Sequence, residues 1–289
     1  MTSESFVSIV IPARDEAENI AGVIHEIHSV LRDYRHYEIV VVDDGSRDQT
    51  LTVASNTAEA LGCAFKGVAH RHSIGQSGAL RSGVNVARGA LVITMDGDGQ
   101  NDPADIPLLL QQAAMINNPD YCIAGFRFAR QDSAWKRFQS RLANRVRNAL
   151  LHDGVPDTGC GLKLLPKATF LKLPWFDHIH RFIPALVRGI GGEIRVVRVG
   201  HRPRRAGISK YSAWNRAWVG IVDLFGVRWL LARTPNPDFI TDDNREYSSH
   251  GQVGPTPVFP GYCQRGSSRG ETRLAGYAGE PDGLSAPSP

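Results

Sequence analysis

Cysteine is scarce in this chain of 289 residues, which has four: Cys63, Cys122, Cys160 and Cys263. None forms a Cys-x-x-Cys pair, so neither a zinc site nor a disulfide framework is expected, and this usage fits a reducing compartment. Long apolar runs are lacking near the start as well. The run at residues 6–11 is shorter than the apolar core of a secretory leader, so no signal peptide is expected.

A glycine-rich dinucleotide fingerprint is also missing. Such a site needs Gly-x-Gly-x-x-Gly directly after the first strand. The chain has Pro12-Ala13-Arg14-Asp15-Glu16 at that place. An NAD enzyme of the Rossmann type is therefore not expected.

The first half of the chain alternates strand and helix patterns. Short apolar runs predict strands at residues 7–11, 39–42, 64–68 and 91–95. Apolar residues at helical spacing predict helices at residues 20–31, 50–61 and 79–87. Asp15 is expected to cap the first helix. This order predicts an α/β fold with a mostly parallel sheet flanked by helices.

The expected strand at 91–95 ends in Asp96-Gly97-Asp98-Gly99-Gln100. Residues two apart on an extended backbone point the same way, so Asp96, Asp98 and Gln100 would offer three oxygen ligands. Mg²⁺ takes oxygen ligands and is often shared between carboxylates and a substrate's phosphates. Open α/β sheets bind ligands at the carboxyl ends of their strands, so this pattern predicts a metal-diphosphate site.

Three other structures could account for this acidic segment. An EF-hand loop needs glycine at its sixth position and glutamate at its twelfth, where this chain has Asn101 and Pro107. A hairpin turn is disfavoured, because the following residues do not alternate and Pro103 followed by Asp105 is typical of a helix start. A solvated acidic loop without a ligand stays open.

The strand at 39–42 also ends in acidic residues, Asp43 and Asp44, followed by Gly45 and Ser46. In a doubly wound sheet, this end and that of the 91–95 strand would open onto one crevice. The two carboxylates could accept hydrogen bonds from a base N–H or a ribose hydroxyl. Taken alone, Asp-Asp-Gly-Ser is more typical of a turn with a helix cap.

Positive charge is unevenly distributed, although the formal net charge is +4. One basic cluster contains Arg127, Arg130, Lys136, Arg137, Arg141, Arg145 and Arg147. A second contains Arg195, Arg198, His201, Arg202, Arg204, Arg205, Lys210 and Arg216. Such clusters predict an anionic partner, either phosphates or an acidic membrane surface. Nucleic acid is not expected, because the aromatics lie in an apolar helix and not on a stacking sheet.

The second half predicts a basic helix at 134–151, a helix at 182–188 and a strand at 194–199. A further helix from Trp214 to Leu231 presents apolar residues on one side: Trp218, Ile221, Val222, Phe225 and Trp229. Asp223 and Arg228 interrupt it, so it is not expected to span a membrane. Its aromatics and the nearby basic residues suit a helix that lies in the membrane interface. An ordinary helix packed on the domain is the alternative that stays open.

Five short motifs follow one another in the chain: Ile11–Glu16, Val42–Ser46, Asp96–Gln100, Asp157–Gly161 and Arg204–Tyr211. In this order they resemble the family-2 glycosyltransferases of GT-A fold, and within these the dolichyl- or polyprenyl-phosphate sugar synthases. The resemblance covers about residues 7–231. Several such relatives continue into transmembrane helices, and none is expected here.

This resemblance implies a donor site. The residues that would hold the nucleoside are Pro12, Arg14, Glu16, Asp43 and Asp44. Those that would bind Mg²⁺ or Mn²⁺ on the diphosphate are Asp96, Asp98 and Gln100. Better-known members often carry an aromatic or small residue at the position of Arg14, so its contact with the base stays open.

The resemblance also implies an acceptor side. Arg127, with Lys136 or Arg137 and Ser140, would face the acceptor phosphate. Arg204 and Lys210 would close over the diphosphate, and Asp157 would either orient the acceptor side or cap a turn. The implied catalytic set is Asp96, Asp98, Arg127, Asp157, Arg204 and Lys210.

The implied division of the chain has three parts. Residues 1–212 would form the GT-A catalytic domain, and residues 213–233 an amphipathic helix at the membrane interface. Residues 234–289 are rich in Gly, Pro and Ser without periodicity. Such a segment buries too little apolar area to offset the entropy of ordering, so a disordered tail is expected.

The implied reaction moves a sugar from GDP-mannose or a UDP-sugar to a polyprenyl or dolichyl phosphate, with inversion, for glycan or lipopolysaccharide modification. A lipid monophosphate loses its second proton at about pH 6 and therefore needs no general base. A divalent ion and converging Arg/Lys groups would stabilise the leaving nucleotide. The expected location is the cytoplasmic face of the cell membrane, with peripheral or monotopic attachment.

Two alternatives stay open. A transferase that acts on a hydroxyl of a cell-surface glycan or lipid would need a carboxylate base near residues 157–161. A non-catalytic module could reuse the fold to bind nucleotide sugars or anionic lipids. The intact Asp96-x-Asp98 pair argues against the second alternative.

Overall fold

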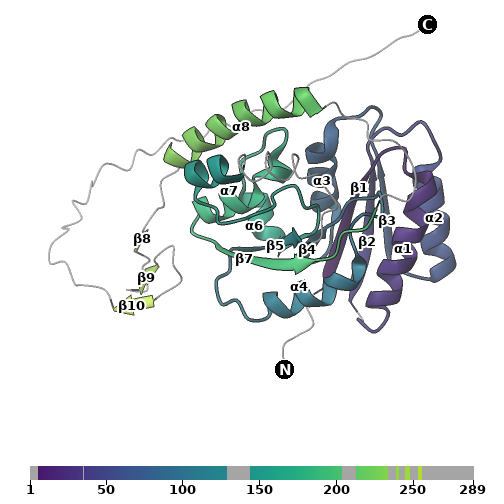
Figure 1. The fold of residues 1–289 in the computed structure, drawn as a ribbon. Helices are drawn as coiled ribbons and strands as arrows, with labels where there is room; N and C mark the ends of the chain where they lie inside the picture. The colour runs from purple at the N-terminus through teal and green to yellow at the C-terminus, as the bar shows by residue number, and fades with distance from the viewer. Residues whose placement is uncertain are drawn as a thin grey trace, which may run out of the picture.

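The computed structural model describes residues 6–34, 36–128, 144–203, 213–233, 239–240, 245–247 and 253–255. A seven-stranded sheet in the order β3-β2-β1-β4-β6-β5-β7 forms the centre of the fold (Figure 1). Its strands are β1 (Val7–Ala13), β2 (Tyr37–Asp43), β3 (Phe65–Ala69), β4 (Leu91–Thr94), β5 (Tyr121–Arg127), β6 (Lys163–Pro166) and β7 (Glu193–Val199). β6 runs antiparallel to β4 and β5, whereas the other neighbouring pairs are parallel. The mostly parallel α/β sheet expected from the sequence is confirmed.

Helices cover both faces of the sheet (Figure 1). One face carries α1 (Ala17–Leu31), α2 (Thr50–Leu61) and α4 (Ile106–Ala113). The other carries α3 (Gly75–Val86), α6 (Lys167–Lys172), α7 (Ile183–Gly189) and α8 (Ala213–Arg233). Two 3₁₀ turns, η1 (Pro103–Asp105) and η2 (Ile179–Arg181), and a helical segment at 144–151 complete the domain.

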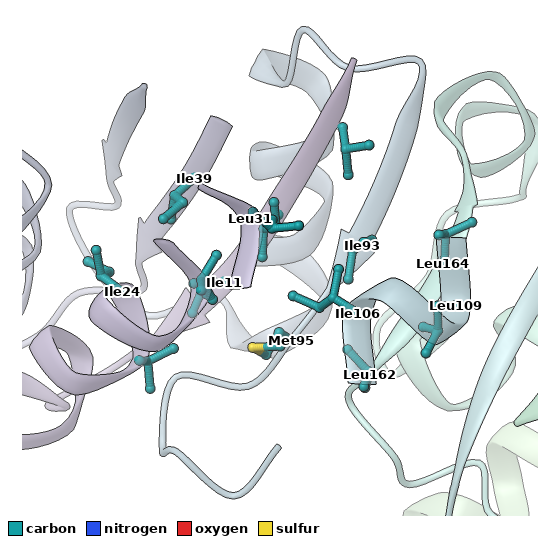
Figure 2. Close-up of a cluster of buried hydrophobic side chains, with 14 of the residues drawn as sticks. Ile11, Ile24, Leu31, Ile39, Ile93, Met95, Ile106, Leu109, Leu162 and Leu164 are labelled. Carbon is teal, nitrogen blue, oxygen red and sulfur yellow. The ribbon is translucent and has the colours of Figure 1, made fainter. Parts of the chain in front are cut away.

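The strands hold the two helical layers together because their side chains alternate between the faces. In β1, Val7, Ile9 and Ile11 enter the cluster under α1, and Val10 enters the cluster under α3. Figure 2 shows the first cluster, in which Ile11 lies near Ile24 of α1. Each fully buried side chain of this size contributes roughly 1.5–3 kcal/mol. These cores fix the strand ends that carry the site.

The start of α1 differs from the sequence-based expectation. Asp15 does not cap the helix: its backbone has a positive φ of 49°, and its Oδ1 accepts the Arg47 N–H at 2.7 Å. Asp48, from the loop before α2, accepts the Ala17 N–H at 3.1 Å instead. A residue distant in sequence supplies the cap, which local spacing does not reveal. α3 also begins at Gly75, four residues before the expected start at 79.

The helix α8 lies alongside α7 (Figure 1). Leu224 and Val227 are buried against the domain. The other side exposes large apolar residues: Ile221 (47%), Val222 (57%), Phe225 (61%) and Trp229 (61%). The Trp218 side chain lies outside the described residues. No helix in the described part of the chain combines the length and apolarity needed to cross a bilayer.

The segment expected to be a disordered tail contains three short strands. β8 (Phe239–Ile240), β9 (Arg245–Tyr247) and β10 (Val253–Pro255) pair as an antiparallel sheet. This pairing is between backbone groups, which composition does not reveal. The other residues of 234–289 lie outside the described part of the chain, and for them the expectation stays a prediction.

Candidate active site

The carboxyl ends of β1, β2 and β4 meet at one edge of the sheet, because β1 lies between the other two and all three are parallel. Ala13 pairs with Asp43, and the Asp44 N–H donates to the Ala13 carbonyl at 2.8 Å. The loop after β4 packs on the same strand, since a Cβ at Gly97 would lie 3.2 Å from that of Ala13. The two acidic strand ends therefore share one edge, as the sequence predicts.

The loop that carries Asp96, Asp98 and Gln100 is a turn and not an extended strand end. β4 stops at Thr94, and Gly99 has a positive φ of 74°. Asp98 Oδ1 accepts the Gln100 N–H at 3.1 Å. The two-residue alternation expected for an extended backbone is therefore wrong here, because the chain turns back towards η1.

Asp96 and Asp98 lie close enough for their charges to repel. Burial, and next the charge of Asp98, raise the pKa of Asp96 to about 6. The charges of Lys163 and Arg127 act on it in the opposite direction. A bound divalent cation would offset the cost of burying the negative charge of Asp96 and its repulsion by Asp98. Carboxylate oxygens are hard ligands that suit Mg²⁺ or Mn²⁺. The residues present therefore fit such an ion.

Two carboxylates do not complete a metal site. Within the described residues, no group of three or more His, Cys, Asp or Glu side chains could hold a metal. Mg²⁺ in protein sites usually keeps one or two carboxylates and takes its other oxygens from substrate phosphates and water. The arrangement therefore suits an ion that binds together with a diphosphate.

Asp43 and Asp44 have different surroundings. Asp44 is buried, and its oxygens accept four hydrogen bonds, from His70 Nδ1 (2.8 Å), Ser73 Oγ (2.6 Å), Ile74 N–H (2.8 Å) and Gly75 N–H (2.9 Å). Burial alone would raise the pKa of Asp44, but these hydrogen bonds outweigh it and hold the pKa below its usual value. Asp44 therefore organises the loop before α3. The half-buried Asp43 accepts the Ser46 N–H at 2.8 Å, and its role towards a nucleoside stays a prediction.

The other expected nucleoside residues line the same corner. Pro12 is half-buried in β1, opposite Val42. Arg14 Nη1 donates to Ser73 Oγ at 3.1 Å, which joins the β1 end to the loop before α3. Glu16 is buried, and its Oε2 accepts a hydrogen bond from Asn19 Nδ2 at 2.6 Å. The Glu16 carboxylate thus supports the first turn of α1, and its role towards a nucleoside stays a prediction.

Arg127 and Asp157 form a two-pronged ion pair. Arg127, the last residue of β5, donates from Nε to Asp157 Oδ2 at 2.6 Å and from Nη2 to Oδ1 at 2.9 Å. Burial would lower the pKa of Arg127, but the bonds to Asp157 and its charge outweigh burial and raise it. Gly159 lies close by, since a Cβ there would be 3.1 Å from Arg127 Nη2. Asp157 therefore holds a permanently charged guanidinium near Asp96.

Two residues at this site are not among the sequence-based candidates. Lys163, at the start of β6, is buried and donates from Nζ to the carbonyls of Thr158 and Cys160. Gln76, in the first turn of α3, donates from Nε2 to Asp96 Oδ1 at 2.9 Å. No motif marks either residue, because both reach the site through the packing of distant segments.

The two basic clusters are partly internal. Arg147 is buried, and its guanidinium bonds Thr158, Asp153 and the Val155 carbonyl. Arg202 pairs with Glu26 and Asp102, at 2.6 Å in both cases. The charge of Arg147 is therefore paired with Asp153, and that of Arg202 with Glu26 and Asp102, so these two arginines add little support for an anionic partner.

Five predicted site residues lie outside the described residues: Lys136, Arg137, Ser140, Arg204 and Lys210. The described residues just before Arg204 contact the loop after β4. The Arg202 N–H donates to the Gln100 carbonyl at 3.0 Å, and Asn101 forms an antiparallel bridge with His201. The segment that carries Arg204 therefore starts beside the loop of Asp98.

The sequence matches a family described as glycosyl transferase family 2 over residues 8–173. It is 31% identical over 235 residues to a dodecaprenyl-phosphate galacturonate synthase of Rhizobium johnstonii, covering 80% of this chain and 69% of that one. It is 36% identical over 209 residues to an undecaprenyl-phosphate 4-deoxy-4-formamido-L-arabinose transferase of Pseudomonas paraeruginosa, covering 72% of this chain. The chain spans 60% of the length of that second relative.

Solved structures share the fold. A glucosyl-3-phosphoglycerate synthase from Mycobacterium tuberculosis, crystallised with Mn²⁺, UDP-glucose and glycerol 3-phosphate, superposes with a TM-score of 0.57. The alignment covers 88% of each chain at 18% identity. At this level of identity the likeness concerns the architecture, which is of the GT-A kind expected from the motifs.

Proposed function

The chain belongs to glycosyl transferase family 2, and we propose that it moves a sugar from a nucleotide sugar to a polyprenyl phosphate. Both relatives described above are named for a polyprenyl phosphate, one with galacturonate and one with formamido-arabinose. An acidic or amino sugar is therefore favoured over mannose as the transferred group. The nucleotide is UDP or GDP.

One observation carries this proposal: acidic and basic groups converge at the carboxyl edge of the sheet. The charge of Asp98 raises the pKa of Asp96, and the charges of Lys163 and Arg127 lower it, so all three groups lie near Asp96. A site with only carboxylates would suit a cation, and one with only arginines would suit an anion. Both together suit a reaction in which a metal-bound diphosphate meets a second phosphate.

The donor would bind where β1, β2 and β4 end. Asp43, Pro12 and Arg14 would hold its nucleoside, and Asp96 and Asp98, with Gln100, would hold Mg²⁺ or Mn²⁺ at its diphosphate. When bound, the ion would neutralise the charge that grows on the leaving nucleotide. Arg204 and Lys210 would add positive charge from the segment that starts beside this loop.

The acceptor would approach from the side of Arg127. Its guanidinium, held by Asp157, would attract the lipid phosphate, with help from Lys136 or Arg137 and Ser140. A phosphate dianion attacks without a general base, and a single displacement inverts the sugar's anomeric centre. A hydroxyl acceptor would need a carboxylate base, and Asp157 is engaged with Arg127 by both oxygens. This geometry favours the phosphate acceptor.

The reaction can be tested with purified protein, Mn²⁺ and a panel of radiolabelled GDP-mannose, UDP-glucose and UDP-galacturonate. Label should enter the organic phase only when a short polyprenyl phosphate is present. Label that moves to a polyprenyl alcohol or a glycan hydroxyl, and not to the phosphate, would contradict the proposal. Binding of nucleotide sugars without turnover would point to a binding module.

We expect the exposed side of α8 to rest on the cytoplasmic surface of the cell membrane, where the lipid acceptor lies. Replacing Phe225 and Trp229 together by serine should weaken binding to vesicles containing anionic lipid at least about ten-fold, because each large side chain contributes on the order of 1 kcal/mol or more on leaving water. Both side chains are exposed, so the fold should persist. Cosedimentation with vesicles measures this binding.

A matched control is Met115→Ser, which removes another exposed apolar side chain, just after α4. It should cosediment like the unmodified protein. If the double variant also does so, α8 is an ordinary surface helix of the domain. Deleting α8 is a poorer test, because Leu224 and Val227 belong to the core.

A further inference from the structure

The Asp96 carboxylate is confined by segments that are far apart in the sequence. Gln76 Nε2 donates to its Oδ1 at 2.9 Å. Gly161 also packs against this carboxylate, so closely that any Cβ there would collide with it. The Asp96 N–H is fixed as well, by Asn101 Oδ1 at 2.9 Å. Of these contacts, the one from Gln76 is the hydrogen bond that sets how the carboxylate group is turned.

Gln76 is itself held on both sides. The preceding residue, Gly75, donates its N–H to Asp44 Oδ2 at 2.9 Å and has a positive φ of 87°, which turns the chain into α3. The following residue, Ser77, is buried and bonds His180 Nδ1 at 2.8 Å. The backbone of Gln76 therefore has a fixed place, and its side chain has a defined reach to Asp96.

The same contacts connect the two halves of the donor site. Asp44 directly follows Asp43, which is proposed to hold the nucleoside. The Asp44 carboxylate accepts hydrogen bonds from Ser73, Ile74 and Gly75, the three residues before Gln76. Gln76 in turn holds the carboxylate proposed to bind the metal. Mutation of a partner that orients a metal ligand in this way typically lowers metal affinity by about 10- to 100-fold.

We infer that Gln76 is a positioning residue for the metal site: its amide holds the Asp96 carboxylate turned so that Asp96 and Asp98 can share one divalent ion. This inference rests on the proposed function, because it presupposes that the two aspartates bind a metal. In this inference Gln76 would contact neither the sugar nor the lipid, and it would affect the metal only through its hydrogen bond to Asp96.

The test is a titration of Mn²⁺ into the full chain with UDP, and separately with GDP, in which the electron paramagnetic resonance signal of free Mn²⁺ reports binding. Gln76→Met keeps the length of the side chain and removes the amide. It should weaken Mn²⁺ binding about 10- to 100-fold. Gln111→Met, on the exposed side of α4, is the matched control and should bind as the unmodified chain does.

Thermal unfolding separates positioning from a general loss of structure. The melting temperature of Gln76→Met should stay near that of Gln111→Met while Mn²⁺ affinity falls. Gln76→Asn is the second variant, for the case that methionine disturbs α3: its amide is one methylene too short to reach Asp96, so the same loss of affinity is expected.

The outcomes are distinct. If the unmodified chain binds Mn²⁺ and both folded variants bind it equally well, the inference is wrong and the proposed function stands. An unmodified chain that binds no Mn²⁺ with either nucleotide overturns the proposed metal site and this inference with it. A parallel fall of affinity and melting temperature in both variants shows a structural role only and also overturns the inference.

Discussion

Replacing Asp98 by alanine is expected to lower the sugar-transfer rate by about 10³-fold while the protein stays folded. Asp98 is half-buried in the loop after β4, and its Oδ1 bonds the Gln100 N–H of its own turn. Its removal takes away one of two carboxylates that would hold the metal on the leaving diphosphate. Stability should change little, because the charge repulsion on Asp96 is relieved at the same time.

Turnover at saturating Mn²⁺ and thermal unfolding measure these two effects. Asp33→Ala is the control: it removes an aspartate that is 91% exposed after α1, and it should leave both unchanged. A folded Asp98→Ala protein with the rate of the unmodified chain would show that the acidic loop takes no part in the reaction.

The second large effect is expected from Gly161→Ala. The added methyl group would occupy the space of the Asp96 carboxylate, so that Asp96 must turn away from its position against Gln76. Thr94 Oγ1 also bonds the Gly161 carbonyl at 2.6 Å, which limits how far the backbone can yield. We expect a rate reduced by about 10²-fold and a stability lowered by about 1–3 kcal/mol.

Initial rates and chemical denaturation can measure both quantities. Gly67→Ala in the edge strand β3 is a matched control, because its Cβ would meet the flexible end of Leu51 at 3.0 Å and lies away from Asp96. A Gly161→Ala enzyme with normal rate and normal Mn²⁺ dependence would mean that the orientation of Asp96 is unimportant, and the inference about Gln76 would lose its basis.

The sequence predicts the part of the site that strand order determines. Apolar runs locate β1, β2 and β4, and the short helical connections make them parallel, so Asp43 and Asp96 must end at the same edge. The resemblance to the glycosyltransferase family adds Arg127 and Asp157. Asp43 and Asp96 owe their places to the order of the strands, which the spacing of apolar residues reveals, whereas Arg127 and Asp157 are suggested only by the resemblance.

Side-chain partners across the fold are not predictable in this way. Gln76 of α3 bonds the Asp96 carboxylate, and Lys163 of the antiparallel strand β6 acts on it through its charge. Both effects depend on how distant segments pack. For a related reason, counting basic residues in the sequence does not predict which of them are free to bind an anion. Arg147 and Arg202 add to basic clusters in the sequence, yet in the fold Arg147 pairs with Asp153, and Arg202 with Glu26 and Asp102.

The most direct test of the metal-dependent mechanism is anomalous diffraction from crystals of this protein soaked with Mn²⁺ and UDP. We predict one manganese peak between the carboxylates of Asp96 and Asp98, with the diphosphate completing its coordination, and no such peak in crystals of Asp98→Ala. A well-ordered nucleotide without manganese at this corner, or manganese bound elsewhere, would contradict the account.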